Sequence, residues 1–459
     1  MADIFIAYGH EDKNLVTHLA KALEVKGWSV FWDEQIGPEA FGRVIEREIK
    51  QAAVMIVVWS NASVDAEWPK SEVDMARNLG RQIFHLRISD AQLPLPFNIQ
   101  NALDFTGWRG DQNSLAFRKL DHALKKSITR PVGNGQIINW PCFFRSVSSH
   151  ECFLEPLDAV AAFKIADPMP ILLSAFDLWH NKDAEALYKE MKTLHGDSYL
   201  VMLDSGDYES KRKGVDLSWD DYKDTLVKAS GTFDIAVCYD VHSRSTRSET
   251  IIKEIVEGFQ RDAEIAPAEK LAPVVHLPEG KASPIERVPE IFFALANSLK
   301  PPLIAIPERE LGDGILARAR QISRIRSELD KLDRYQPIHV LGTGNPLSIA
   351  IFALAGADSF DGLEWCRTAV DFQTARLHHT QQYDFFSYQS QSAEDKGIRD
   401  ALSNNNFSFL DKVALHNLAF FEEWMDRIAD NERQSGWLKS YLPPGGYDDL
   451  RRELPEVFL

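Results

Sequence analysis

Two acids bracket a tryptophan in the segment "VVWSNASVDAEWPKSEVDMA", residues 57–76, which begins with an apolar run typical of a buried strand. Glu72 follows Trp68 by four residues, which places both side chains on one face of a helix. A carboxylate and an aromatic ring so placed can form one wall of an active site. The structural alternative is a capped amphipathic helix, because acids such as Glu67 near a helix N-terminus interact favourably with the helix dipole.

The first part of the chain, about 110 residues, alternates apolar strands with helices, which predicts a parallel sheet with helices on both faces. The strands are expected at residues 4–8, 29–32, 54–59 and 83–88. Helices are expected between them, and a further helix near residues 114–128. Because open sheets bind ligands at the carboxyl ends of their strands, Tyr8, Trp32 and Asp33 should lie beside the segment that holds Glu72.

The opening segment, "DIFIAYGHEDKNLVTHLAKALEVKGWSVFWDEQIGPEAF", combines a strand ending in Tyr8, an early helical acid, Asp12, a "WSVFWDE" strand and a Gly-Pro loop. Together with "VVWSNASVDAEWPKSEV", it resembles the bacterial Toll/interleukin-1 receptor (TIR) family over about 110 residues. The resemblance implies a flavodoxin-like α/β domain. It also implies that Glu72, in the "WPKSE" position, is the catalytic glutamate of an NAD+ glycohydrolase, and that residues 33–40 flank its cleft.

This activity suits a single carboxylate. Breaking the bond between nicotinamide and ribose develops an oxocarbenium ion, which a nearby carboxylate such as Glu72 can stabilise, and nicotinamide needs no proton to leave. The residues expected to bind NAD+ are Tyr8, Gly9, Trp32, Asp33 and Trp68. The alternative is structural, since such tryptophans often belong to the core and an aspartate can simply cap a loop. NAD+ is expected as a substrate, with no cofactor and no metal.

Composition limits the other possibilities. The chain has 459 residues, of which 44% are hydrophobic and 26% charged, and this suits a globular protein of about two domains. Its four cysteines form no CxxC pair, so neither a disulfide framework nor a cysteine-rich zinc site is expected. The sequence contains neither a membrane-span pattern nor a signal-peptide pattern, which predicts a cytoplasmic protein. Nearly all of the formal net charge of -17 lies after residue 130, which disfavours nucleic acid as a partner.

The pattern changes scale after residue 136, where apolar strands recur every 30 to 36 residues with helix-like segments between them. The expected strands are residues 171–175, 199–203, 233–239, 273–277, 303–306 and 338–341. Several end in polar residues, as in a (β/α)8 barrel, although an open α/β sheet would have the same pattern. We therefore expect a TIR domain at 1–130, a linker at 131–138, a barrel at 139–380 and a helical extension at 381–459.

Three fragments of the larger domain carry a second resemblance: "LVMLDSGDYES" (200–210), "FDIAVCYDV" (233–241) and "PIHVLGTGNPLSIAIFALAGADSFDGLEWCR" (337–367). In order and spacing they resemble the tRNA-guanine transglycosylase superfamily, whose fold is a (β/α)8 barrel. The resemblance implies that Asp361 is a nucleophile at ribose C1′, Asp204 an acid/base partner and Asp240 a reader of a purine-like base. The chain departs from that family at Asp207, which replaces a glycine, and in lacking its zinc cluster of three cysteines and a histidine.

Three hypotheses for the larger domain follow. It is a barrel that senses an unknown trigger ligand or protein and controls the TIR domain, or a base-exchanging or glycosidic enzyme, or an oligomerisation platform. The three aspartates can also be ordinary residues of the barrel rim.

For the whole protein we expect an antiphage, immune-type effector whose TIR domain cleaves NAD+ to nicotinamide and ADP-ribose or a cyclic variant. Homo-oligomers or filaments, formed through TIR–TIR contacts in which residues 33–40 complete a neighbour's cleft, should activate it. One alternative is a scaffold that only binds other TIR domains. The other is a transglycosylase with an accessory TIR domain.

Overall fold

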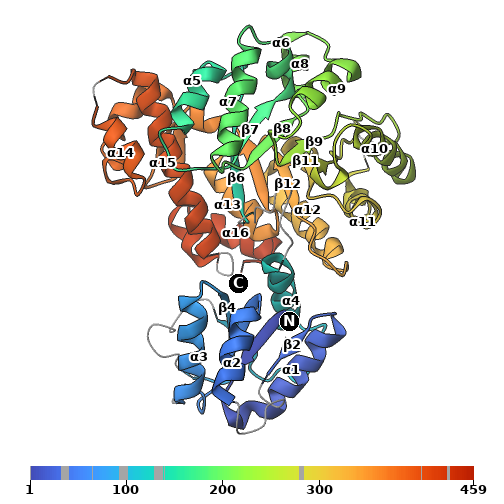
Figure 1. Cartoon of the computed structure of the whole chain (residues 1–459), viewed down its shortest axis with the longest axis vertical. Coiled ribbons are helices and arrows are strands. Elements are labelled where there is room, and N and C mark those ends of the chain that lie inside the picture. Colours follow the sequence, from blue (N-terminus) through green and yellow to red (C-terminus); the bar gives the residue numbers. More distant parts are fainter. Residues whose placement is uncertain are drawn as a thin grey trace. The chain divides into compact units, whose positions relative to one another are not determined.

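The computed structural model describes residues 2–32, 41–64, 66–91, 102–128, 138, 140–278, 284–404, 406–431 and 435–458, without the side chains of residues 41–43 and 67–69. The chain divides into two compact units, residues 1–130 with 333–335 and residues 131–332 with 336–459 (Figure 1). A parallel sheet between helices forms the first unit, and a barrel of parallel strands inside a layer of helices forms the second. The predicted α/β fold class is therefore confirmed. The predicted linker at 131–138 lies, apart from Ile138, outside the described residues.

The sheet of the first unit has the strand order β2-β1-β3-β4-β5, and its strands are all parallel. They are β1 (Ile4–Ala7), β2 (Val30–Phe31), β3 (Val54–Trp59), β4 (Gln82–Arg87) and β5 (Leu103–Asp104). Every residue of β1 and β3 is buried, which explains why both strands are continuous apolar runs. β5 is additional to the strands expected, because two residues are too short for a periodic pattern.

Helices cover both faces of this sheet: α1 (Lys13–Val25), α2 (Phe41–Gln51), α3 (Glu67–Asn78) and α4 (Leu115–Ser127). Successive side chains of a strand point to opposite faces. Ile4 and Ile6 of β1 therefore join a core cluster with α1 and α4, whereas Phe5 and Ala7 join another with α2 and α3. This arrangement puts α3, which carries Glu72, against the face formed by Phe5 and Ala7.

The second unit contains eight parallel strands in the order β10-β9-β8-β7-β6-β13-β12-β11. They are β6 (Cys142–Val147), β7 (Ile171–Ser174), β8 (Val201–Asp204), β9 (Ile235–Val237), β10 (Leu271–Ala272), β11 (Ile304–Pro307), β12 (Ile338–Leu341) and β13 (Ser359–Gly362). A parallel bridge between Val274, just after β10, and Ala305 of β11 joins the two ends of this order. The bridge closes the barrel and excludes the open sheet that the same sequence pattern allowed.

Helices surround this barrel: α5 (Pro156–Phe163), α6 (Ala175–His180), α7 (Ala184–Gly196), α8 (Asp207–Lys213), α9 (Trp219–Lys228), α10 (Ser248–Ala263), α11 (Val288–Leu299), α12 (Gly314–Leu329), α13 (Pro346–Ala355), α14 (Lys396–Leu402), α15 (Phe409–Asp430) and α16 (Gly446–Glu453). One core cluster fills the barrel with side chains such as Phe144 and Met202. A larger cluster, with Phe143 and Leu203, lies between the strands and the helices. Among the helices that the structure describes, none is both long and apolar enough to span a membrane.

The helix α15 belongs to the barrel layer although it lies in the C-terminal extension. It packs against α13, α5 and β6, and Figure 1 shows it beside α5. The rings of Phe421 in α15 and Phe143 in β6 stack with centroids 4.6 Å apart. Trp424 donates a hydrogen bond of 2.9 Å from Nε1 to the carbonyl of Pro346, at the start of α13. Because α15 takes the helix position that follows β13, the C-terminal segment completes the barrel.

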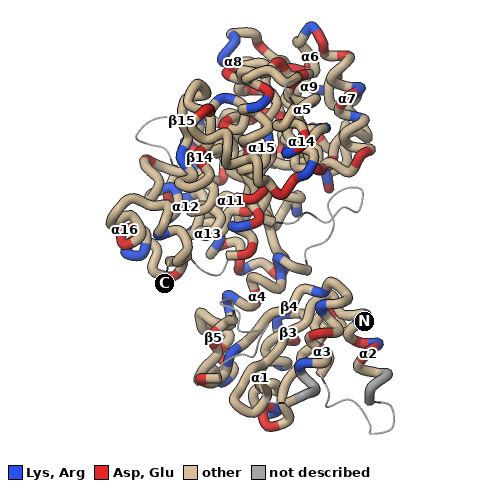
Figure 2. The backbone as a smooth tube through the Cα atoms, turned by 90° about the vertical axis from the view of Figure 1, so that its left-hand side faces the viewer, with Lys and Arg blue, Asp and Glu red and all other residues tan. Residues whose placement is uncertain are grey.

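Charged residues are distributed along both units. Figure 2 shows acidic and basic residues interspersed along the tube in each of them. The formal net charge of -17 therefore arises from many scattered acids and not from one acidic segment.

Candidate functional site

Two aromatic residues lie at the carboxyl ends of neighbouring strands in the first unit. Tyr8 follows β1, Trp32 follows β2, and their ring centroids are 6.1 Å apart with the planes inclined by 58°. Trp32 is only 7% exposed and belongs to the core, whereas Tyr8 is half-buried. Tyr8 is therefore less buried than Trp32, and the binding roles of both residues stay predictions.

The loops after β1 and β3 are held against each other. A Cβ atom added to Gly9 would lie 2.9 Å from Cβ of Ser63, so only glycine fits there without a shift. Ser60 donates a hydrogen bond of 2.7 Å from Oγ to Oδ2 of Asp12. Burial raises the pKa of Asp12, and the hydrogen bond from Ser60 works in the opposite direction. These contacts hold the first residues of the loop that connects β3 to α3.

Glu72 lies in the second turn of α3 and is half-buried. Its neighbour Val73 is fully buried in the core cluster that α3 shares with β1 and β3. The helix therefore holds Glu72 next to a residue that packs against the sheet. Asp33 and the side chain of Trp68 lie outside the described residues, as does the loop 33–40, and the catalytic role of Glu72 stays a prediction.

The three aspartates predicted in the second unit lie at one end of the barrel, where the carboxyl ends of its strands meet. Asp204 ends β8, Asp240 follows β9 and Asp361 lies in β13. Burial raises the pKa of Asp204 well above its ordinary value, and nearby acids, among them Asp240 and Asp361, raise it further. The three carboxyl groups thus interact electrostatically, although their individual roles stay predictions.

Each of these aspartates is also held by hydrogen bonds. Asp361 accepts one of 3.0 Å from Oγ of Ser146 and one of 2.8 Å from the backbone N–H of Gly342. Asp240 accepts one from the hydroxyl of Ser205. Because barrel enzymes place their active sites at this end of the strands, the cluster is a candidate ligand site.

Sequence reasoning missed His276 and Glu310, which lie in the same group. His276 follows β10, and Glu310 lies in the short helix η5 (Glu308–Leu311) after β11. Burial opposes the charged form of the imidazole, yet hydrogen bonds to Asp240 and Glu310 raise the pKa of His276 to about 10. A histidine inside the apolar segment 273–277 was the one available signal, because such a strand otherwise consists of core residues.

The structure also gives Asp207 partners. Its Oδ1 lies 3.1 Å from Nε2 of His242, and its Oδ2 lies 2.8 Å from Nζ of Lys211. Burial opposes ionisation, but hydrogen bonds from His242 and Lys211 lower the pKa of Asp207 to about 2. The residue that departs from the transglycosylase pattern is therefore a charged member of the barrel-end group.

Residues 4–120 match the family model described as TIR domain. The N-terminal unit is a TIR domain. Over 97 residues the chain is 24% identical to the protein named putative cyclic ADP-D-ribose synthase TIR2 of Cytobacillus dafuensis. The match covers 19% of this chain and 26% of that protein, so the chain spans about a quarter of its relative's length. The resemblance to the TIR family is confirmed, and the resemblance of the barrel to transglycosylases stays a prediction.

Proposed function

We propose that the TIR domain cleaves the bond between nicotinamide and ribose in NAD+, with Glu72 as the catalytic carboxylate. The observation that carries this proposal is the position of Glu72 in the second turn of α3, the helix that follows the central strand β3 of the TIR sheet. Tyr8 and Trp32, at the ends of the next two strands, supply aromatic surface for the flat rings of the substrate. The name of the relative, a putative cyclic ADP-D-ribose synthase, supports chemistry at this bond.

In the proposed reaction the nicotinamide ring leaves with the bonding electron pair and becomes neutral. The ribose carbon becomes an oxocarbenium ion, whose charge the carboxylate of Glu72 stabilises. A water oxygen, or an adenine nitrogen of the same molecule, then bonds to that carbon and a proton passes to solvent. The first route yields ADP-ribose and the second yields a cyclic variant.

We also propose that the barrel is a sensor that controls this activity. In this proposal the whole protein is an antiphage effector that becomes active when its copies assemble into oligomers or filaments. The carboxyl groups at its strand ends support a ligand site for an unidentified trigger. TIR–TIR contacts through residues 33–40 are proposed to complete the cleft of a neighbouring protomer.

Glu72→Gln tests the enzymatic part, and Asp74→Asn, which removes an exposed acid from the same helix, is the matched control. Glu72→Gln should lower NAD+ consumption by at least ~100-fold, while Asp74→Asn should leave it unchanged. With wild-type protein, consumption should rise more steeply than linearly with protein concentration. Equal activity of Glu72→Gln and wild type refutes the catalytic role, and association without any NAD+ consumption supports the scaffold alternative.

A second candidate function is base exchange at the barrel, favoured by the mutual electrostatic influence of Asp204, Asp240 and Asp361. In that reaction Asp361 would attack ribose C1′ and displace a purine-like base. Release of guanine-like bases that Asp361→Ala abolishes would support it, whereas release that persists in this variant would exclude Asp361 as the nucleophile.

A further inference from the structure

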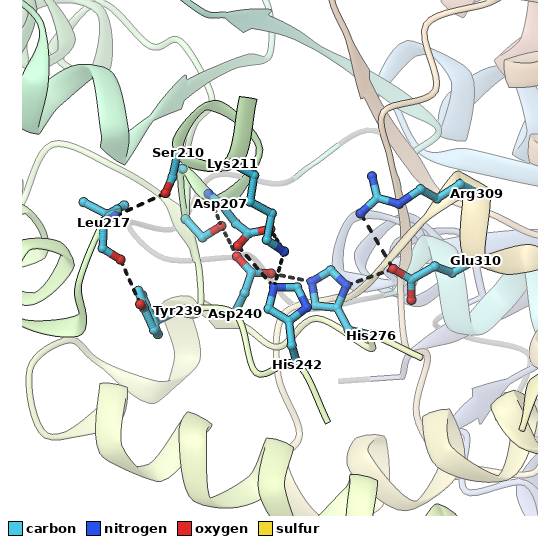
Figure 3. Close-up of polar contacts among 12 residues, drawn as sticks. Asp207, Ser210, Lys211, Leu217, Tyr239, Asp240, His242, His276, Arg309 and Glu310 are labelled. Atoms are coloured by element: carbon cyan, nitrogen blue, oxygen red, sulfur yellow. Dashed lines mark hydrogen bonds and ion pairs between the residues drawn. The ribbon is translucent and has the colours of Figure 1, made fainter. Parts of the chain in front are cut away.

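Three side chains on two neighbouring loops at the end of the barrel have the composition of a metal site (Figure 3). Asp240 and His242 follow β9, and His276 follows β10. One possible ligand atom from each of them lies within 4.8 Å of the other two. The two imidazole rings have centroids 4.4 Å apart, and Nε2 of His276 lies 2.5 Å from Oδ1 of Asp240. Two imidazoles and a carboxylate are donors typical of zinc and related divalent ions.

His276 is held as metal-binding histidines usually are. Its side chain is 6% exposed, and its Nδ1 lies 3.0 Å from Oε1 of Glu310. The backbone N–H of Leu277 donates a hydrogen bond of 2.6 Å to the other oxygen of Glu310 and so fixes that carboxylate. In metal sites a carboxylate commonly orients the ligating imidazole through the nitrogen that does not touch the metal. Glu310 occupies this position, and it leaves Nε2 of His276 directed at Asp240.

The outer side of the group contains a fourth carboxylate and a lysine. Oδ1 of Asp207, at the start of α8, lies 3.1 Å from Nε2 of His242. The ammonium group of Lys211 lies 2.8 Å from the same nitrogen and 2.8 Å from Oδ2 of Asp207. Lys211 is 55% exposed, so it can move into solvent when another cation takes its place. The side chains of Asp207 and His242 therefore already bind a cation, the ammonium group of Lys211.

We propose that Asp240, His242 and His276 bind one divalent transition-metal ion, with Asp207 as a further ligand and Glu310 orienting His276. The ion replaces the proton on Nε2 of His276, which passes to solvent, and it displaces Lys211 from His242. Because the side chain of His242 is 42% exposed, water can reach the ion, and a metal that takes more than four ligands can bind it beside the four protein ligands. This site does not depend on cleavage of NAD+, and it differs from the expectation of no metal, which rested on cysteine usage.

The test uses the full chain, stripped of metal with a chelator and titrated with Zn²⁺ in a calorimeter. Wild type should bind one ion at this site, and His242→Ala and Asp240→Asn should each raise its dissociation constant by at least ~10-fold. His180→Ala, which removes another exposed histidine of the same unit, is the matched control and should bind as wild type does. Co²⁺ absorption spectra should change in His242→Ala, because one nitrogen ligand is lost, and circular dichroism should show that each variant is folded.

Two outcomes overturn the proposal. One is Zn²⁺ binding that is absent from wild type or equal in wild type, His242→Ala and Asp240→Asn. The other involves a second group, Asp167, Asp395 and Glu422, whose oxygens also lie within 4.8 Å of one another. If the ion remains bound in His242→Ala and is lost in Glu422→Gln, it occupies that oxygen-only group instead.

Discussion

His416 of α15 should make the barrel unit sensitive to mild acid. Its Nε2–H donates a hydrogen bond of 2.7 Å to the carbonyl of Val370, and in the neutral imidazole Nδ1 accepts the one of 2.9 Å from the hydroxyl of Ser390. The rings of Phe372 and Tyr383 pack around it, with centroids 4.6 and 5.2 Å away. Burial lowers the pKa of His416 to about 4, although the bond to Val370 favours the charged form. Burial therefore favours the neutral imidazole in the folded protein.

The direction of this pH dependence follows from the linkage between proton binding and folding. Because the folded-state pKa lies below the unfolded value of 6.5, the neutral imidazole stabilises the native state above pH 6.5, and this stability is lost as the pH falls toward 4. With these two pKa values, the free energy of unfolding should fall by about 2 kcal/mol between pH 7.5 and pH 5. Because His416 is fully buried, solvent screening does not reduce this value much.

The assay is urea unfolding, followed by tryptophan fluorescence at pH 7.5 and pH 5, for wild type and His416→Gln. Glutamine does not titrate, so the stability advantage of wild type over the variant should shrink by about 2 kcal/mol at the lower pH. His180→Gln, which changes an exposed histidine, should show the same difference from wild type at both pH values. An advantage of wild type over His416→Gln that is equal at pH 7.5 and pH 5 would refute the reasoning.

Three further changes should alter stability in defined ways. Asp358→Asn removes the carboxylate that pairs with the buried guanidinium of Arg326, and should lower the free energy of unfolding, measured in urea, by about 3 kcal/mol. Gly344→Ala would place a Cβ atom 1.6 Å from Oε2 of Glu364, so it should lower the melting temperature, and adding Glu364→Ala should restore it. Gly9→Ala would bring the new Cβ atom 2.9 Å from Cβ of Ser63, in the loop after β3. It should lower the melting temperature of the TIR domain by a few degrees, or about 1 kcal/mol. An unchanged melting temperature would show that this loop can move to accommodate the methyl group.

Local patterns predicted most of the fold. The helical spacing of Leu15, Leu19 and Leu23 marks α1, and the continuous apolar run of β3 marks a strand buried on both faces. No strand was expected at β6 or at β13, and the four residues of β13 include Asp361 and Gly362 and form no apolar run. Local patterns also could not show that the barrel closes, since closure depends both on the bridge between Val274 and Ala305 and on the pairing of β6 with β13, which lie far apart along the chain.

The candidate sites divide in the same way. Glu72 and Tyr8 belong to motifs that are continuous in the sequence, so the TIR site could be proposed from neighbouring residues alone. Asp204 and Asp240 could be expected at one end of a barrel, because each comes at the end of an apolar segment, whereas Asp361 was expected there only from the transglycosylase resemblance. The sequence thus predicted at which end of the barrel these aspartates lie, but it did not predict which residues contact them.

The amino-acid sequence by itself determined the TIR domain, the α/β class and the strand ends that carry acids, because these properties depend on residue order over short distances. Only the tertiary structure decided that α15 completes the barrel layer and that His276 lies between Asp240 and Glu310. The physical reason is that these residues come from different strand-end loops. Their distances, and the pKa values that burial and neighbouring charges set, exist only once the barrel has closed around them.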